Sequence, residues 1–206
     1  MCGIIGYIGH QPALPILLEG LKRLEYRGYD SAGLAMVNDN GLQVRKAAGR
    51  IAILEGKVTG ERNTLLGGSL GIAHTRWATH GVPSERNAHP HISGGLAVVH
   101  NGIIENFEEL RATLQAKGYV FTSETDTEAI AHLLHDTLKT VSDLFEAVRA
   151  TIAQLVGAYA IGIVSEAYPD RVIVARKGSP LLLGIGEDGH YAASDTAALL
   201  QVTRKV

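Results

Sequence analysis

The sequence predicts an α+β fold with antiparallel sheets. Helical patterns gather in a few stretches, and strand patterns follow one another between them, without the regular strand and helix alternation of parallel sheets. The chain has 206 residues, of which 46% are hydrophobic, and can therefore bury one sizeable core. We expect a single domain over residues 1–206.

Composition favours a small-molecule substrate over a charged polymer. The net charge is -2 and no run of lysine or arginine occurs, so neither nucleic acid nor an anionic membrane is expected as the main partner. One cysteine cannot form an internal disulfide, which suits a reducing compartment. The apolar start lacks a basic flank and is interrupted by Gly3, Gly6 and Gly9, so neither a signal peptide nor a membrane span is predicted. We expect a cytoplasmic protein.

The first 50 residues contain three predicted strands and one helix. The apolar, β-branched stretch Gly3–Ile8 is typical of a buried strand. Five leucines from Leu14 to Leu24 recur at helical spacing, which predicts a helix with one core-facing side. Strands at Leu34–Val37 and Leu42–Ala47 flank the turn sequence Asn-Asp-Asn-Gly and predict a hairpin. A short helix and a surface loop are expected over residues 51–63.

Three helices and then a run of strands are predicted beyond residue 100. Asn106, with Glu109 three residues on, predicts a capping box for the first helix. The second begins near Asp126 and turns its apolar side chains to one face, which leaves His132 and His135 on the solvated side. The remaining elements are expected at about Leu144–Leu155 for the third helix and at Tyr159–Val164, Arg171–Ala175, Leu181–Ile185 and His190–Ala193 for the strands.

The single cysteine stands next to the initiator methionine. If Met1 is removed, Cys2 carries a thiol nucleophile and an α-amine base on one residue, with ordinary pKa values of about 8.5 and 7.7–8.0. N-terminal nucleophiles use this pairing, and because the two groups share one Cα, we expect a water molecule to bridge them. The alternative is that Cys2 is a small buried hydrophobic residue.

Two short glycine motifs match known patterns but lack the context that those patterns need. Residues 67–71 fit G-x-S-x-G around Ser69, but the nucleophile elbow of serine hydrolases has a helix after the serine, and here a strand is predicted. Residues 184–189 fit G-x-G-x-x-G, but a strand follows them. We therefore predict a hairpin turn at the second motif and no nucleotide site.

A predicted strand from Gly71 runs into a polar cluster suited to an amino-acid substrate. Arg76 offers a two-pronged donor for a carboxylate, and Trp77, the only tryptophan, offers a cover that excludes water. Thr79 and His80 add polar groups in the same predicted loop. The alternative is a structural tryptophan in the core with the arginine stacked on it.

Tyrosines flank Arg27 in the glycine-rich segment before the second strand. Tyr26 and Tyr29 are placed to hold the guanidinium by stacking. An ordinary loop would also explain the segment, because Gly28 and Asp30 are common turn residues.

Asn101-Gly102 follows the strand predicted at Leu96–His100. An asparagine amide is a neutral donor, and glycine lets a backbone N–H approach a ligand closely, so the pair is a candidate oxyanion hole. An Asn-Gly turn explains the same residues.

Asp126 also has two interpretations. It is a good N-cap for the helix that begins there, but if Thr125 caps the helix instead, the Asp126 carboxylate can bind a substrate ammonium.

Five histidines between residues 74 and 100 raise the question of a metal site. No cysteine pair, H-E-x-x-H motif or helical i, i+4 histidine pair accompanies them. A metal site is therefore not expected.

Five ordered motifs resemble those of the class II glutamine amidotransferases. They are MCGIIG at 1–6, YRGYDSAG at 26–33, GIAHTRWATHG at 71–81, HNGIIEN at 100–106 and SETDTE at 123–128. Within the class they are most similar to the branch that makes glucosamine 6-phosphate from fructose 6-phosphate; the purine-pathway branch resembles the N-terminus but differs at Tyr29 and residues 75–80. The resemblance covers nearly the whole chain. It implies the N-terminal-nucleophile hydrolase fold, a four-layer αββα sandwich of two antiparallel sheets.

The resemblance also implies a role for each site residue. Cys2 would attack the side-chain amide of L-glutamine once Met1 is removed, with its own amine as the base, and form a thioester. The side chain of Asn101 and the N–H of Gly102 would stabilise the oxyanion. The other implied residues are Arg76, Thr79 and His80 for the substrate carboxylate, Asp126 with the Gly102 carbonyl for the ammonium, Trp77 for gating ammonia, and Arg27, Tyr29 and His89 as supports.

Further partners are implied beyond this chain. No cofactor is expected. The ammonia would pass to a C-terminal sugar isomerase part that this chain lacks, in a full-length enzyme expected to be a homo-oligomer. The chain alone is expected to hydrolyse glutamine to glutamate and ammonia without making glucosamine 6-phosphate.

Overall fold

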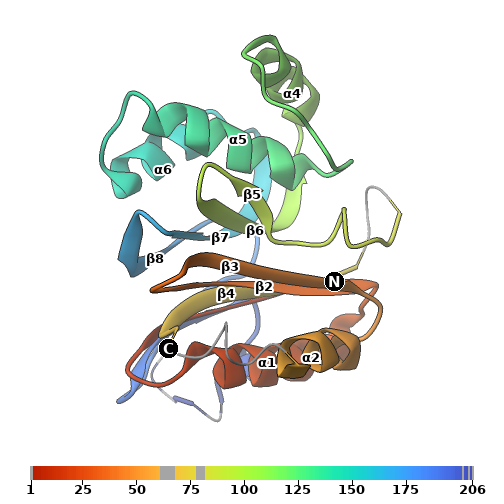
Figure 1. Cartoon of the computed structure of the whole chain (residues 1–206), viewed down its shortest axis with the longest axis vertical. Coiled ribbons are helices and arrows are strands. Elements are labelled where there is room, and N and C mark those ends of the chain that lie inside the picture. The colour runs from red at the N-terminus through yellow and green to blue at the C-terminus, as the bar shows by residue number, and fades with distance from the viewer. Residues whose placement is uncertain (1, 61–67, 78–81, 201, 204, 206) are drawn as a thin grey trace.

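Two antiparallel sheets lie face to face, and helices cover both outer faces (Figure 1). The structure is a computed structural model that describes residues 2–60, 68–77, 82–200, 202–203 and 205. Met1, Thr79 and His80 of the predicted site lie outside these residues, as does the end of the surface loop expected before residue 63. The predicted α+β class and four-layer αββα order are confirmed.

The first sheet has six strands in the order β3-β2-β4-β1-β10-β9. Their bounds are β1 (Gly3–Gly9), β2 (Ser31–Asn38), β3 (Gly41–Ala48), β4 (Leu70–Arg76), β9 (Leu182–Ile185) and β10 (Gly189–Ala193). Central strand β1 pairs antiparallel with β4, and Gly3 lies opposite Thr75. This register brings Cys2 beside Arg76 and Trp77, at the end of β4.

The second sheet has four strands in the order β5-β6-β7-β8. Their bounds are β5 (His91–Ser93), β6 (Leu96–Ile104), β7 (Gly157–Ser165) and β8 (Tyr168–Lys177). Strand β6 continues past the predicted end at His100, and Asn101 and Gly102 pair with Ala160 and Tyr159 of β7. The Asn-Gly turn considered from the sequence is therefore wrong.

Helices cover each sheet on its outer face. Helices α1 (Ala13–Leu24) and α2 (Ile51–Gly60) lie on the six-stranded sheet, whereas α4 (Phe107–Ala116), α5 (Asp126–Leu138) and α6 (Leu144–Ile152) lie on the side of the four-stranded sheet. Two short 3₁₀ helices are η1 (Glu25–Arg27) and η2 (Thr196–Ala198). None of the described helices has both the length and the apolar character needed to cross a membrane.

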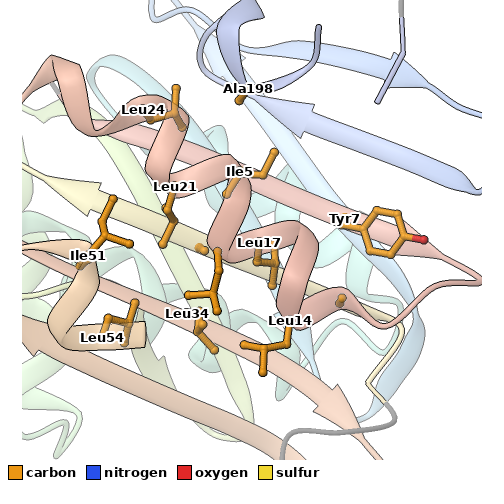
Figure 2. Close-up of a cluster of buried hydrophobic side chains, with 14 of the residues drawn as sticks. Ile5, Tyr7, Leu14, Leu17, Leu21, Leu24, Leu34, Ile51, Leu54 and Ala198 are labelled. Carbon is orange, nitrogen blue, oxygen red and sulfur yellow. The ribbon is translucent and has the colours of Figure 1, made fainter. Parts of the chain in front are cut away.

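Three hydrophobic cores separate the four layers. In the first, the leucines of α1 pack with α2 on the outer face of the six-stranded sheet, for instance against Ile5 and Leu34 (Figure 2). The middle core joins the two sheets, with Ile4 and Ile72 facing Val99. The third lies between the four-stranded sheet and α5 and α6. Successive side chains of β1 point to opposite faces of the sheet, so Ile5 packs in the first core and Ile4 in the middle core.

Both glycine motifs have the context that the sequence predicted. Ser69 directly precedes strand β4, so it does not lie on a strand-to-helix elbow. Strands β9 and β10 pair antiparallel across residues 186–188 and form the expected hairpin.

The predicted capping box of α4 is wrong. Asn106 occupies the N-cap position, but its side chain makes no hydrogen bond to that helix. Its Nδ2 instead donates to Gln154 O at 2.9 Å, and its Oδ1 accepts the Val156 N–H at 3.0 Å. The chain after α6 returns beside Asn106 and offers better-placed backbone partners, a contact between distant segments that local sequence does not reveal.

Candidate active site

A cavity of about 480 Å³ contains most of the predicted site residues. Eight of them line it: Cys2, Arg27, Arg76, Trp77, His89, Asn101, Gly102 and Asp126. Six residues that the sequence did not assign to the site also line it: His100, Ile103, Thr125, Ser179, Pro180 and Ser194. Strand ends from both sheets and the start of α5 therefore meet at one hollow.

Cys2 is half-buried at the start of β1, with its thiol held against the end of β4. Its Sγ accepts the Trp77 N–H at 3.2 Å, and its carbonyl oxygen accepts Asn101 Nδ2 at 3.1 Å. Burial raises the pKa of the Cys2 thiol, while the Trp77 N–H and the charge of Arg76 act in the opposite direction. Cys2 is therefore not a fully buried core residue, and it lines the cavity.

Gly102 has a backbone conformation that only glycine adopts readily. Its φ is +128°, and a Cβ there would lie 2.1 Å from Ala158 O. Asn101, the preceding residue on β6, places its amide between two partners: Nδ2 on the Cys2 carbonyl and Oδ1 at 2.8 Å from His74 Nε2. A neutral side-chain donor therefore lies beside the thiol-bearing residue.

Arg76 and Trp77 lie on either side of the point where β4 ends. Arg76 is buried, and its Nη1 lies 3.9 Å from Asp30 Oδ1. Trp77 is 55% exposed, and its ring covers Gly28, where a Cβ would lie 1.7 Å from Trp77 Cε3. The alternative of a core tryptophan is therefore wrong: Trp77 lines the cavity, and only a glycine at position 28 leaves room for its indole.

Asp126 is the first residue of α5, and Thr125 is its N-cap. The interpretation of Asp126 as the cap is therefore wrong. One carboxylate oxygen accepts the Ile104 N–H at 2.9 Å, and the other lies 3.7 Å from His100 Nδ1. The carboxylate lies in the first turn of a helix, where the helix dipole interacts favourably with a negative charge.

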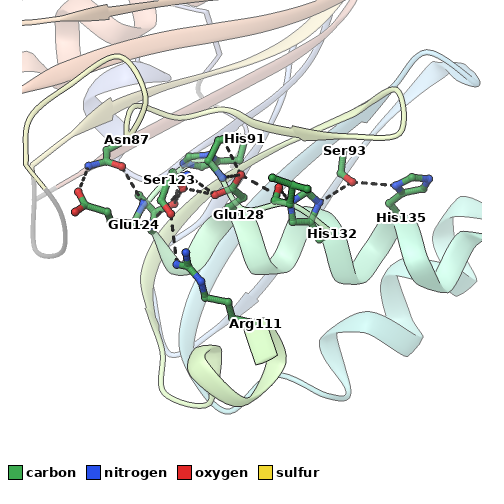
Figure 3. A network of polar contacts seen from close by, with 12 residues as sticks. Asn87, His91, Ser93, Arg111, Ser123, Glu124, Glu128, His132 and His135 are labelled. Atoms are coloured by element: carbon green, nitrogen blue, oxygen red, sulfur yellow. Dashed lines mark hydrogen bonds and ion pairs between the residues drawn. The ribbon is translucent and has the colours of Figure 1, made fainter. Parts of the chain in front are cut away.

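A polar network holds the segment that leads to Asp126 (Figure 3). The carboxylate of Glu128 accepts hydrogen bonds from the backbone and hydroxyl groups of Thr122 and Ser123. Burial opposes ionisation of Glu128, but these bonds prevail and lower its pKa. Asn87 adds a link to Glu124 at 2.8 Å. The start of α5 is thus fixed by contacts on both sides.

His132 and His135 do not lie on a solvated face, as the sequence predicted. His132 is buried and His135 half-buried, and the Nδ1 atoms of both lie 2.9 Å from Ser93 Oγ (Figure 3). His132 also packs against the rings of Tyr119 and Phe121. The β5–β6 hairpin covers this side of α5, which the helical pattern alone does not indicate.

Four further histidines, His74, His89, His91 and His100, are buried near the cavity, and two of them, His89 and His100, line it. His74 stacks on His89 with ring centroids 4.2 Å apart, and burial lowers the pKa of His74 and of His91 to about 3. Among the described residues, no three side chains of the metal-binding types form a metal site. Burial also lowers the pKa of His89 well below its ordinary value, so the rings of His74, His89 and His91 act as neutral hydrogen-bonding groups.

Arg27 contacts the C-terminal part of the chain. Its Nη1 donates to Ser194 O at 3.3 Å and to Asp195 Oδ2 at 3.1 Å. The ring of Tyr29 lies beneath a different cation, Arg50, at 5.2 Å, and Tyr29 does not line the cavity. Tyr29 thus contacts Arg50, whereas the Tyr26 hydroxyl donates at 2.7 Å to Asp195 Oδ2, the atom that also accepts Arg27 Nη1.

Ser194 is a lining residue that no local signal could reveal. Its Oγ accepts the Ile4 N–H at 2.9 Å, so it joins the end of β10 to the first residues of β1. It occurs in no motif, and its place depends on pairing between strands at opposite ends of the chain. Only the folded topology identifies it.

A thiol, an amide donor, a buried cation and a carboxylate around one cavity suit chemistry on the amide of an amino acid. The family model described as a glutamine amidotransferase domain matches residues 74–201, which is more than half of the chain. The chain belongs to the glutamine amidotransferase family. The matched part contains Arg76, Asn101, Gly102 and Asp126, whereas Cys2 lies before it.

Relatives of this amidotransferase chain include glutamine–fructose-6-phosphate aminotransferases (isomerizing). It is 57% identical over 205 residues to the one from Pseudomonas putida and 58% identical over 208 residues to the one from Acidithiobacillus ferridurans. The matches cover 98% and 100% of this chain but only 33% and 34% of the relatives. The chain thus spans about a third of the length of these relatives.

Solved structures of amidotransferases have the same architecture. The glutamine phosphoribosylpyrophosphate amidotransferase of B. subtilis superposes with a TM-score of 0.81 at 30% identity, over 98% of this chain and 43% of that one. A glutamine aminotransferase class-II domain protein from Silicibacter pomeroyi has a TM-score of 0.61 at 16% identity, over 93% of this chain and 88% of that one. The second likeness is one of fold alone.

Proposed function

We propose that this chain hydrolyses L-glutamine to L-glutamate and ammonia through a thioester on Cys2. The observation that carries the proposal is the meeting of Cys2, Asn101, Arg76 and Asp126 around a single cavity in a member of the amidotransferase family. Each of these side chains matches a need of the reaction: a nucleophile, an oxyanion donor, and one charge for each end of an amino acid.

Substrate recognition depends on two opposite charges. Arg76 binds the α-carboxylate through its guanidinium, and Asp126 binds the α-ammonium. Both side chains line the cavity, whose volume lies in the range typical of small-molecule sites. Thr79, His80 and the carbonyl of Gly102 complete the set of substrate contacts in this proposal.

The chemistry begins when the free α-amine of Cys2 accepts the thiol proton through a water molecule. Sγ then attacks the amide carbon of glutamine, and the carbonyl oxygen becomes an oxyanion. When the C–N bond breaks, the ammonium of Cys2 returns its proton to the leaving nitrogen, and ammonia is released. Water, deprotonated by the same amine, attacks the thioester, releases glutamate and restores the thiol.

Asn101 and Gly102 lower the barrier by donating to the oxyanion. In proteins of known mechanism, loss of one such donor costs about 3 kcal/mol of transition-state stabilisation. The position of Asn101 Nδ2, 3.1 Å from the carbonyl oxygen of the nucleophile's own residue, supports this role. Arg27, Tyr29 and His89 support the surroundings of the thiol, and Trp77 gates the ammonia.

In the longer protein, we propose that the ammonia serves the synthesis of glucosamine 6-phosphate from fructose 6-phosphate. The relatives named for that substrate are about three times as long as this chain, which leaves room for a C-terminal sugar isomerase part. We propose a cytoplasmic homo-oligomer for this longer form, with residues 1–206 as its glutaminase domain.

Ammonia release from glutamine tests the proposal. Protein shown by N-terminal sequencing to begin at Cys2 should release ammonia, and Cys2→Ala should lose nearly all of this activity. Ser69→Ala, which changes the serine of the rejected hydrolase motif, should remain active. Glutamine binding without turnover in the wild type would indicate an amino-acid sensor instead, and activity in Cys2→Ala would exclude the proposed nucleophile.

A further inference from the structure

His74 is a buried residue that the proposed mechanism does not use. It lies on β4, opposite Ile4 of β1 and Gly33 of β2, and its side chain has no exposed surface. Its Nε2 lies 2.8 Å from Asn101 Oδ1. Both ends of the Asn101 amide are therefore hydrogen-bonded, the oxygen to His74 and the nitrogen to the Cys2 carbonyl.

The Cys2 carbonyl decides which way the amide faces. A carbonyl oxygen only accepts hydrogen bonds, so the atom 3.1 Å from it must be the NH₂ of Asn101. The oxygen of Asn101 then faces His74 Nε2, and an oxygen at 2.8 Å requires a proton on that nitrogen. His74 Nδ1 has no hydrogen-bond partner among the described residues, which fits a neutral ring protonated on Nε2 alone.

The surroundings keep the ring neutral and fix its plane. Burial, aided by nearby His100 and Arg76, lowers the pKa of His74 to about 3, although its hydrogen bond to Asn101 acts in the opposite direction. The ring stacks on His89, whose Nδ1 lies 3.4 Å from the His100 N–H and whose Nε2 lies 3.1 Å from Thr127 Oγ1. His74 is therefore a donor of constant charge in a fixed position.

We propose that His74 is a positioning residue, which holds the Asn101 amide with its NH₂ toward the cavity and its oxygen away from it. In the opposite orientation, Asn101 would present its oxygen to the Cys2 carbonyl and to the oxyanion, two groups that only accept hydrogen bonds. A ring that donates through Nε2 favours the productive orientation before substrate arrives. The inference rests on the proposed glutaminase function, which gives Asn101 its oxyanion role.

The first test needs no turnover. Nitrogen-15 NMR of histidine-labelled protein should give His74 the signature of a ring protonated only on Nε2, unchanged between pH 6 and pH 8. His74→Leu serves to assign the signal. A proton on Nδ1 would overturn the inference, even if the wild type hydrolyses glutamine normally.

The second test separates positioning from stability. With glutamine as the probe, His74→Leu should lower kcat about 10- to 100-fold with KM within about 2-fold, since part of a 10²–10³-fold oxyanion contribution is lost. His74→Gln, which can still donate to Asn101, should recover most of kcat. The matched control is His132→Leu, at a buried histidine on α5 that bonds Ser93 and does not line the cavity, which should keep kcat.

Each outcome of these tests bears on either the inference or the proposed function. Native kcat in a folded His74→Leu protein would overturn the inference, and so would a His74→Gln protein as slow as His74→Leu. If His74→Leu does not fold, the inference is still tested by the tautomer of His74 in the wild type and by the kcat of His74→Gln. A wild type without ammonia release would refute the proposed function instead, and the tautomer would then remain the test of His74.

Discussion

Single side chains carry charges of opposite sign at the site. Arg76 is buried beside Asp30, while Asp126 is held by the Ile104 N–H at the first turn of α5. A buried charge needs compensation by partners or by a ligand. Arg27, Arg76 and Asp126 line the same cavity. In the proposed function, Arg76 and Asp126 bind the two charged ends of a zwitterionic amino acid.

Arg76→Ala should raise the KM for glutamine more than it lowers kcat. A hydrogen bond to a charged group contributes about 1.5–3 kcal/mol, which corresponds to an increase in KM of about 10- to 100-fold. Arg149→Ala, at an exposed arginine on α6, is the control and should leave both constants unchanged. Steady-state ammonia release measures them, and an effect confined to kcat would count against the carboxylate role.

Gly102 should not tolerate a side chain. Gly102→Ala places a Cβ 2.1 Å from Ala158 O at a φ of +128°. We therefore expect the free energy of unfolding to fall by about 3 kcal/mol or more, and little activity to remain. Gly118→Ala isolates the conformational part, because Gly118 has a φ of +90° but nothing within 4 Å, and should cost about 1 kcal/mol. Urea unfolding compares them; equal costs would contradict the steric argument.

At the scale of elements, strands β4, β5 and β6 carry a layer of buried histidines at the cavity. His91 on β5 is buried, and its Nε2 lies 2.8 Å from Thr125 Oγ1, the residue before Asp126. Burial holds the pKa of His91 at about 3, well below its ordinary value. The neutral ring of His91 therefore joins β5 to the start of α5, and its protonation opposes folding.

This layer predicts loss of stability in acid. An unfolded histidine takes up a proton below about pH 6.5, whereas folded His91 does so only near pH 3, so its stabilising contribution is complete above pH 6.5 and is lost as pH falls. Each such residue contributes a slope of up to about 1.4 kcal/mol per pH unit. Urea unfolding gives the free energy of unfolding at each pH. Between pH 6 and pH 4, His91→Gln should reduce the dependence of this free energy on pH, whereas Ile92→Gln, at an exposed residue, should leave it unchanged. Identical slopes in the wild type and His91→Gln would refute this.

Element prediction from sequence succeeded where periodicity reflected burial and failed where distant segments meet. The leucines of α1 face one core, so their spacing was sufficient to predict that helix. Asn106 looked like a cap, but Gln154 and Val156 are its partners. His132 looked solvent-facing because the β5–β6 hairpin that covers it is contributed by another part of the chain. Local patterns do not encode such contacts.

At the scale of the molecule, the middle core joins the two sheets that each supply part of the site. Cys2 and Arg76 belong to the six-stranded sheet, whereas Asn101 and Gly102 belong to the four-stranded sheet. Their relative position depends on how side chains such as Ile72 and Val99 pack between the sheets. Stability of this core and geometry of the site are therefore linked.

Ile72→Ala should destabilise the protein by about 2–5 kcal/mol, because Ile72 is completely buried in the middle core. Ile53→Ala on α2 is the matched control, since Ile53 is 51% exposed and should lose well under 1 kcal/mol. Chemical unfolding measures both. Similar losses in the two variants would contradict the assignment of the middle core.

The sequence was sufficient to predict the fold class, and it supplied Cys2, Asn101 and Asp126 as candidates because their motifs occur in a recognisable order. The choice between their functional and local interpretations needed the structure, which places Asn101 inside β6 and makes Thr125 the cap of α5. His74 and Ser194 gave no usable signal, because each acts through a partner far away in the chain.

Mass spectrometry of acid-quenched protein during turnover tests the central claim most directly. Protein mixed with glutamine and quenched within one turnover should carry one glutamyl group on the peptide that begins with Cys2, as a thioester that hydroxylamine removes. A glutamyl group on any other residue, or steady ammonia release by protein that retains Met1 or lacks the Cys2 thiol, would contradict the account.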